Sequence, residues 1–179
     1  MTKYIAFLRA INVGGHTVKM DALRGLFEAL GLSNVETFIA SGNVIFDGPD
    51  GDTRALEKKI EVHLQESLGY AVATFVRSTS ELAQVAGYPA FAEAEMKVEG
   101  SGLYIGFLAQ GPTPEAAQKL LACATEVDDF HLHGREVYWL CRTRFSESLF
   151  SGPRLEKTLG MQTTIRNVTT IKKLVAKYA

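Results

Sequence analysis

Apolar residues in the first part of the chain recur with the spacing of an α+β domain. Between Tyr4 and Ile11 they occupy both faces of an extended segment, which indicates a strand in the middle of a sheet. From Leu23 to Leu30 they fall three and four positions apart, which indicates a helix followed by a left-handed Gly31. The further elements expected here are strands 35–41 and 43–47 about a turn at Gly42, a helix that is capped by Asp52 and ends at Gly69, and a strand 71–77.

The same order of elements returns in the second part of the chain. A looser segment with a Tyr88-Pro89 break precedes the apolar run 103–109, which indicates another central strand. The triplet Thr113-Pro114-Glu115 is typical of a helix start, because it offers a cap, a proline at the first helical position and an acid in the first turn. The remaining expected elements are strands 128–133 and 135–141 about Gly134, a helix 153–159 before Gly160, a strand 163–166 and a last helix capped by Asn167.

The order βαββαβ therefore occurs twice. We expect an α+β protein of duplicated ferredoxin-like subdomains with antiparallel sheets and a C-terminal helix. The predicted divisions are a first subdomain 1–78, a connecting segment 79–101, a second subdomain 102–166 and the helix 167–179. In this topology the first two strands of a subdomain run parallel. The loop after the first strand and the hairpin after the second strand then lie at the same edge of the sheet.

This edge of the first subdomain carries a candidate ligand-binding site. Asn12, Gly14 and Gly15 come just before a helix that begins near Lys19, and Ser41 and Asn43 flank the hairpin glycine. Adjacent glycines let backbone N–H groups approach a ligand, and a helix N-terminus with a nearby lysine favours a phosphate or a carboxylate. The segment matches neither of the common glycine-rich phosphate motifs, so the alternative is that the glycines only let the loop turn.

Two arginines are further candidates for this chemistry. Arg9 lies in an otherwise apolar segment, where an unpaired guanidinium is costly, so it must reach an edge of the sheet, a carboxylate or a ligand, and we favour a structural ion pair. Arg166 stands at the junction of the last strand and the last helix, where it faces solvent or an anion. Its neighbour Asn167 is expected to act as the helix cap.

Charge leaves the class of partner open. Nineteen Lys and Arg residues against twenty Asp and Glu give a net charge of −1, so no bulk field attracts nucleic acid or an anionic membrane. Residues 151–179, however, carry six basic residues against Glu156. Single-stranded nucleic acid therefore remains an alternative partner, with stacking on aromatic residues of the second sheet. The aromatic residues concerned are Tyr104, Phe107, Tyr138 and Trp139. Aromatic residues of a sheet more often pack in the core, and we expect that role for them before a role in stacking.

The remaining reactive side chains give no catalytic assignment. Asp129, His131 and His133 share one face of a strand with a spacing that suits a metal, but we favour a solvated polar face over a metal site. Cys123 and Cys141 lack the spacing of a zinc site or of a disulfide framework. No nucleophile motif is present. We expect no cofactor, and the sequence leaves open whether the protein is an enzyme.

The apolar runs of the chain are too short for a membrane helix. The longest fall far below the roughly twenty residues that a span requires. The N-terminal apolar stretch is interrupted by Arg9 and is not followed by a cleavage site. We therefore expect a cytoplasmic protein without a membrane partner.

Several short motifs run through the chain from end to end. They are FLRAINVGG from Phe7 to Gly15, Lys19-Met20, Leu23-Arg24, SGNVIF from Ser41 to Phe46, LEKTLG from Leu155 to Gly160 and TIRN from Thr164 to Asn167. These motifs resemble the bacterial family called domain of unknown function 1697. The resemblance implies a cytoplasmic bacterial protein with duplicated ferredoxin-like subdomains. It implies no established activity, cofactor or substrate.

Two residues depart from the pattern of that family. Ala10 stands where the family usually has glycine, and Val168 stands where an aromatic residue usually follows Arg166-Asn167. The second departure removes a ring that could have stacked on a ligand.

The sequence leads to three hypotheses of function. The first is a protein that binds a small anionic ligand or a nucleotide at the loop 12–19 and the turn 41–43. The second is a binding module for single-stranded nucleic acid. The third is a non-catalytic structural or dimerisation protein, and the oligomeric state itself is left open.

Overall fold

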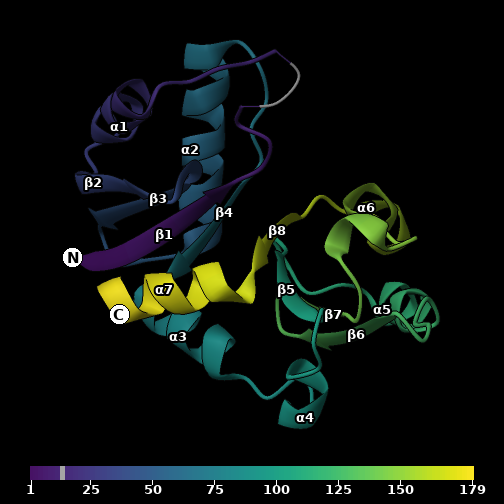
Figure 1. Ribbon diagram of the computed structural model, residues 1–179. Helices are drawn as coiled ribbons and strands as arrows, with labels where there is room; N and C mark the ends of the chain where they lie inside the picture. Colours follow the sequence, from purple (N-terminus) through teal and green to yellow (C-terminus); the bar gives the residue numbers. More distant parts are fainter. Residues whose placement is uncertain (13–14) are drawn as a thin grey trace. The chain divides into compact units, whose positions relative to one another are not determined.

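The computed structural model describes residues 1–12 and 15–179, which form two units (Figure 1). The first unit contains Met1–Ala83 and Leu174–Ala179, and the second contains Gln84–Lys173. Each unit holds one four-stranded antiparallel sheet built in the order βαββαβ, and a helix ends the chain. The α+β class, the duplication and the C-terminal helix are thus confirmed. The predicted division at residues 78, 101 and 166 remains a prediction.

The sheet of the first unit has the strand order β2-β3-β1-β4, and every neighbouring pair is antiparallel. Its central strand β1 is buried on both faces, as its apolar pattern predicted, with Tyr4 and Ala6 on one face and Ile5 and Phe7 on the other. The elements are β1 (Thr2–Leu8), α1 (Met20–Glu28), β2 (Ser33–Phe38), β3 (Ala40–Gly48), α2 (Thr53–Leu68), β4 (Thr74–Ser78) and α3 (Thr79–Gly87).

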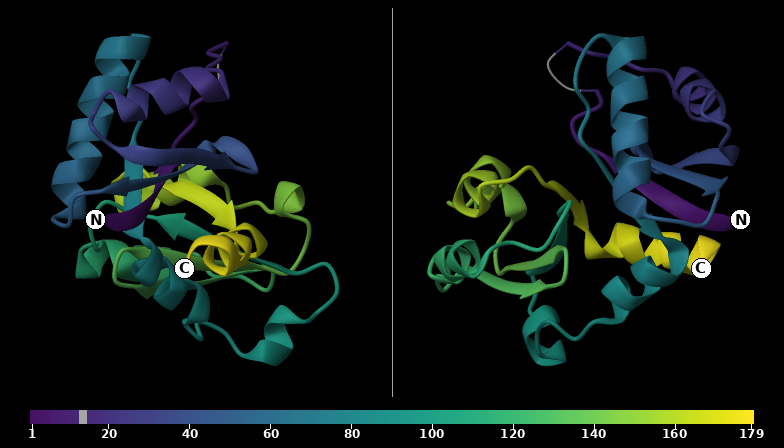
Figure 2. Two further views of the ribbon diagram at one scale, coloured as in Figure 1. Left: turned by 90° about the vertical axis from the view of Figure 1, so that its left-hand side faces the viewer. Right: turned by 180° about the vertical axis from the view of Figure 1, so that it is seen from behind.

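Helices α1 and α2 of the first unit pack on the same face of its sheet (Figure 2). Leu23 and Phe27 of α1 and Ile60 and Leu64 of α2 are fully buried in one core with Ala6 of β1. The opposite faces of both helices are polar, so each helix presents one apolar stripe to the sheet.

The second unit repeats the arrangement with the strand order β6-β7-β5-β8. Strand β7 is buried at every position, and Trp139 is 1% exposed. The elements are α4 (Glu93–Met96), β5 (Gly102–Phe107), α5 (Pro114–Leu121), β6 (Asp128–His133), β7 (Glu136–Cys141), the 3-10 helix η1 (Phe145–Glu147), α6 (Gly152–Leu159), β8 (Thr164–Asn167) and α7 (Val168–Tyr178).

Local signals in the sequence predicted most of the element ends. Asp52 accepts a hydrogen bond from the backbone N–H of Arg54 at 2.9 Å and so caps α2, which ends at Gly69 with φ of 83°. The other confirmed signals are the left-handed Gly31, Gly134 and Gly160 and the capping side chains of Thr113 and Asn167.

The predicted hairpin turn at Gly42 is wrong. Strand β3 begins at Ala40 and contains Gly42, and the residue with positive φ is Ile39, at 68°. The buried amide of Asn43 donates to the carbonyl of Phe38 at 3.1 Å, and this bond across the chain reversal holds the turn three residues earlier than expected. A glycine marks where positive φ is cheap and not where a turn must form.

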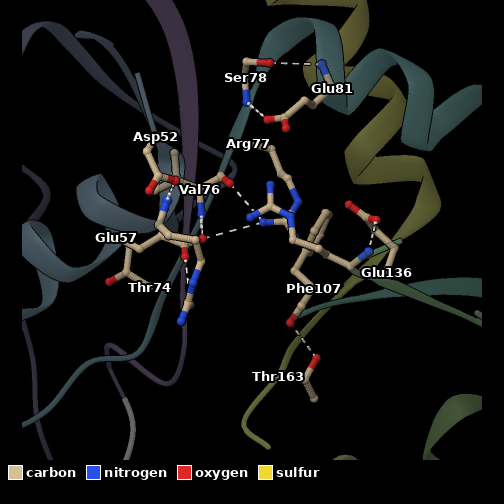
Figure 3. A network of polar contacts seen from close by, with 12 residues as sticks. Asp52, Glu57, Thr74, Val76, Arg77, Ser78, Glu81, Phe107, Glu136 and Thr163 are labelled. Atoms are coloured by element: carbon tan, nitrogen blue, oxygen red, sulfur yellow. Dashed lines mark hydrogen bonds and ion pairs between the residues drawn. The ribbon is translucent and has the colours of Figure 1, made fainter. Parts of the chain in front are cut away.

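A buried ion pair joins α2 to β4 in the first unit (Figure 3). Glu57 and Arg77 are each 1% exposed, and the guanidinium Nη1 lies 3.6 Å from Glu57 Oε2. The same carboxylate oxygen accepts the backbone N–H of Val76 at 2.7 Å, and Arg77 donates back to the Val76 carbonyl at 2.9 Å. One carboxylate therefore holds both the side chain and the backbone of the edge strand.

The C-terminal residues of α7 belong to the first unit. The Tyr178 hydroxyl donates to Glu36 of β2 at 2.8 Å, and its ring meets the Phe38 ring edge-on at a centroid distance of 6.0 Å. Burial, and then the bond to Glu36, raises the pKa of Tyr178 to about 12. The end of the chain is thus tied to an edge strand made early in the sequence.

No helix among the described residues is long and apolar enough to cross a bilayer.

Replacing Glu57 by glutamine should destabilise the protein by about 3 kcal/mol, because it removes the negative charge that lies 3.6 Å from the buried Arg77 guanidinium. Urea unfolding of the variant measures this loss. The double variant Glu57→Gln, Arg77→Met should recover part of it, and Glu66→Gln on the exposed face of α2 serves as the control. Losses of equal size for Glu57→Gln and Glu66→Gln would show that the ion pair contributes little.

Asp47 should make the stability of the protein fall in acid. Hydrogen bonds from Asn34 and then from Lys3 hold the pKa of Asp47 below its ordinary value. A carboxyl with a lowered pKa contributes stability above its unfolded pKa, and this contribution is lost as the pH falls through the folded value. Urea unfolding between about pH 6 and pH 2 should therefore show a shallower pH dependence for Asp47→Asn than for the natural protein. Parallel curves would contradict this role.

Candidate functional site

The candidate site lies where β1 ends in the first unit. Strand β1 pairs Phe7 with Asn43 of β3, so the end of β1 and the β2–β3 hairpin share one edge of the sheet. Arg9 follows directly, and its backbone N–H donates to the carbonyl of Ala73 at 2.9 Å. The Arg9 side chain is half-buried. The topology therefore brings the segments of Arg9 and Asn43 to the same edge, as the sequence predicted.

The loop between β1 and α1 is held at its described ends. The side-chain oxygen of Asn12 accepts the backbone N–H of Val18 at 2.7 Å, which closes the loop across six residues. From the segment before β4, the hydroxyl of Tyr70 donates to the Ile11 carbonyl at 2.9 Å. The ring of His16 stacks on that of Tyr70 at a centroid distance of 3.8 Å. The described ends of the loop are thus held by side-chain contacts.

Helix α1 starts without a capping side chain. Its N-cap residue is Lys19, which is exposed and makes no side-chain capping hydrogen bond. Capping needs an acceptor for the first N–H groups of the helix, and an ammonium group has none to offer. The positive charge also stands at the positive end of the helix dipole. Asp21 in the first turn offsets part of this, although its carboxylate also lies 3.7 Å from Arg24.

Two residues other than glycine have positive φ at this edge. They are Ala10, at 54°, just after β1, and Ile39, at 68°, in the hairpin. Left-handed backbone costs such residues roughly 1–2 kcal/mol each. A β-branched side chain is particularly unsuited to it, yet Ile39 is 60% exposed and gains little from burial. The two residues with unfavourable backbone conformation therefore lie next to Arg9 and in the hairpin. Strained backbone of this kind is typical of functional sites.

The structure treats the predicted site residues differently. Gly15 has φ of 85° and fits the turn for which a glycine was expected. Ser41 belongs to β3, and Asn43 is 3% exposed and braces the hairpin. Gly14 lies outside the described residues. Arg9 is half-buried, and Asn12, Gly15 and Lys19 are exposed.

Arg166 belongs to the second unit and is described there alone. It lies in β8, where its Nη1 donates to the Thr164 hydroxyl at 2.6 Å and to the Ile165 carbonyl at 3.0 Å. Burial lowers the pKa of Arg166 to about 10, which still leaves the guanidinium protonated at neutral pH. Arg166 is therefore a half-buried cation that binds its own strand.

The histidines of β6 contact a tyrosine that the sequence analysis did not single out. The Tyr88 hydroxyl lies 2.8 Å from His131 Nε2, and the Tyr88 ring stacks on His133 at a centroid distance of 4.0 Å. Asp129 lies instead 3.6 Å from Arg142. The described residues form no group of three or more potential metal ligands.

The aromatic residues of the second sheet belong to its core. Phe107, Tyr138 and Trp139 are at most 1% exposed, and Tyr104 is half-buried. Burial raises the pKa of Tyr138 and that of Tyr104 above the ordinary tyrosine value. These rings thus take the core role that was expected of them first.

Comparison with known proteins gives a family and a fold. A family model described as "Protein of unknown function (DUF1697)" matches residues 1–138. No curated protein matches the chain. The conserved bacterial protein SP0830 from Streptococcus pneumoniae has a similar structure, with a TM-score of 0.70 and 23% sequence identity over 98% of this chain and 97% of that chain. At this identity the likeness shows the fold.

Replacing Ile39 by glycine should stabilise the protein by about 1 kcal/mol, because glycine adopts positive φ without the steric penalty. The exposed side chain contributes little burial to offset this gain. Thermal unfolding of Ile39→Gly measures the change, and Ile39→Ala keeps the penalty while it removes the branched side chain. A glycine variant no more stable than the alanine variant would show that the turn is not strained.

Proposed function

We propose that this chain, which belongs to the family described as "Protein of unknown function (DUF1697)", binds a small anionic ligand at the N-terminus of α1. The observation that carries the proposal is Lys19 at the N-cap of this helix. Both the ammonium group and the N–H groups of the first helical turn favour an anion, and an anion there satisfies both at once.

The duplication supplies an internal comparison. Helix α5 follows the first strand of its unit, as α1 does, and its N-cap is Thr113, whose hydroxyl accepts the backbone N–H of Ala116 at 3.2 Å. Helices α2 and α6, which share the other place in the pattern, are capped by Asp52 and Ser151. Of these four described helices, α1 alone has a cation in place of an acceptor.

The surrounding residues support a ligand of small size. Arg9 supplies a second cation at the same edge, and a guanidinium suits a phosphate or a carboxylate through two parallel hydrogen bonds. Gly15, which precedes the helix in the sequence, is exposed and carries no side chain. Asn12 and Tyr70 hold the described ends of the loop, at Val18 and Ile11, through hydrogen bonds. Phosphate esters, nucleotides and organic acids share this chemistry.

The other functions considered from the sequence gain no specific support. The buried rings of the second sheet offer no platform on which bases could stack. A cytoplasmic location, where phosphate esters and organic acids are plentiful, belongs to the same proposal as the anion site.

Replacing Lys19 by serine should separate the two roles of this position. Serine is a strong N-cap residue, so the unliganded protein should become more stable by about 1 kcal/mol. The same change removes the cation, so phosphate, citrate and AMP should raise the melting temperature less than they raise that of the natural protein. Thermal shift at constant ionic strength, with sodium chloride as reference, measures both effects.

The control for this experiment is Lys58→Ser, which removes an exposed lysine from α2 of the same unit. It should leave the response to all three anions unchanged. If Lys19→Ser and the natural protein respond alike, or if no anion raises the melting temperature of the natural protein, the site does not bind anions.

A further inference from the structure

The second unit contains a cavity that the proposed function does not use. Its volume is about 510 Å³, within the range of about 300–1,000 Å³ found for small-molecule sites. Val127, Leu149 and Phe150 line it with apolar surface. Leu149 is 94% exposed, which is unusual for a large apolar side chain beside a cavity. The cavity therefore presents an apolar surface to solvent.

One wall of the cavity is preformed by hydrogen bonds. The Asp128 carboxylate is 3% exposed and accepts from Trp139 Nε1 at 2.8 Å and from the Ser148 hydroxyl at 2.7 Å. The Ser148 oxygen in turn accepts the backbone N–H of Phe150 at 3.0 Å. Phe150 also meets the Trp139 ring edge-on at a centroid distance of 5.2 Å. The Phe150 and Trp139 rings on this side of the cavity are thus held in position by the protein itself.

A basic depression adjoins the cavity. Lys119 of α5 and Arg154 and Lys157 of α6 line it, and no carboxylate is among the described residues that line it. The depression shares Cys123 and Arg154 with the cavity, so the two form one continuous surface. Three cations from two helices face it together, which favours a negatively charged group.

Arg154 connects the basic part of this surface to the apolar part. Its guanidinium carbon lies 5.0 Å from the centroid of the Phe150 ring. Its backbone N–H donates to the Ser151 hydroxyl at the start of α6, so the residue sits on a capped helix. A ligand that rests on Phe150 would then place its polar end beside Arg154.

The charges around the cavity and the depression determine the orientation in which such a ligand binds. Two exposed carboxylates, Glu126 and Glu147, line the cavity together with the buried Asp128 and disfavour a negative group there. The depression has cations and no carboxylate. We propose that this surface binds a small molecule with an apolar body, which enters the cavity, and a single phosphate or carboxylate group, which lies between Lys119, Arg154 and Lys157.

Cys123 gives a direct probe of occupancy, because its half-buried thiol lies where cavity and depression meet. Cys141 is fully buried in the same unit, so its reaction with a maleimide reports unfolding rather than binding. The rate at which N-ethylmaleimide modifies Cys123, read by mass spectrometry, is measured with 1-naphthyl phosphate, 1-naphthoate, inorganic phosphate and 1-naphthol.

The proposal requires both parts of the ligand. At about ten times its dissociation constant, 1-naphthyl phosphate or 1-naphthoate should slow the modification of Cys123 about tenfold. Inorganic phosphate and 1-naphthol at the same concentrations should slow it little, because each fills only one part of the surface. The comparison of the two naphthyl anions shows which anionic group is preferred.

Two variants test the cations one at a time. Arg154→Gln and Lys157→Gln should each weaken the protection by 1-naphthyl phosphate, while Arg144→Gln, an exposed arginine of the same unit outside both linings, should leave it unchanged. Lys19→Ser should also leave this protection unchanged. The experiment therefore tests this site independently of the site proposed at α1. Equal protection by 1-naphthol, no protection by either naphthyl anion, or full protection in both Arg154→Gln and Lys157→Gln would overturn the proposal.

Discussion

The ion pair between Glu57 and Arg77 is the constraint on which the first unit depends. A charge withdrawn from water costs several kcal/mol unless an opposite charge lies beside it, and Glu57 and Arg77 supply such a charge to each other. Apolar contacts alone would let α2 slide along the sheet, whereas the carboxylate must meet both the guanidinium and the Val76 N–H. We infer that this pairing fixes the position of α2 along the sheet. Ile60 and Leu64 of α2 then lie in the same core as the buried residues of α1.

Interactions between residues close together in the sequence were sufficient to predict the order of helices and strands. Caps such as Asp52 and Thr113 bond to backbone two or three residues away, and Gly69 and Gly160 end helices by their own φ. The apolar pattern of β1 predicted its central place because burial on both faces leaves no polar position in the strand. Repeated twice, these signals gave the βαββαβ order without any knowledge of which residues meet.

Contacts between distant segments were the part that the sequence could not show. Gly42 suggested a turn, but the turn lies at Ile39, where the hydrogen bond between Asn43 and Phe38 spans it. Tyr70 reaches Ile11 from 59 residues away, and no local pattern marks it as a support of the β1–α1 loop. Lys19 was found as a charge near a helix, yet its significance as the N-cap became visible only beside Thr113 at the start of α5.

The bond between Tyr178 and Glu36 links two residues that are 142 positions apart, and the whole second unit lies in the loop that it closes. Closing a long flexible loop costs entropy that grows with the logarithm of its length. Once residues 84–173 have folded, the flexible part of this loop becomes much shorter and the bond becomes easier to form. The folding of the second unit therefore favours the completion of the first through chain connectivity alone. During synthesis, the first unit can acquire this last contact only after the second unit has been made.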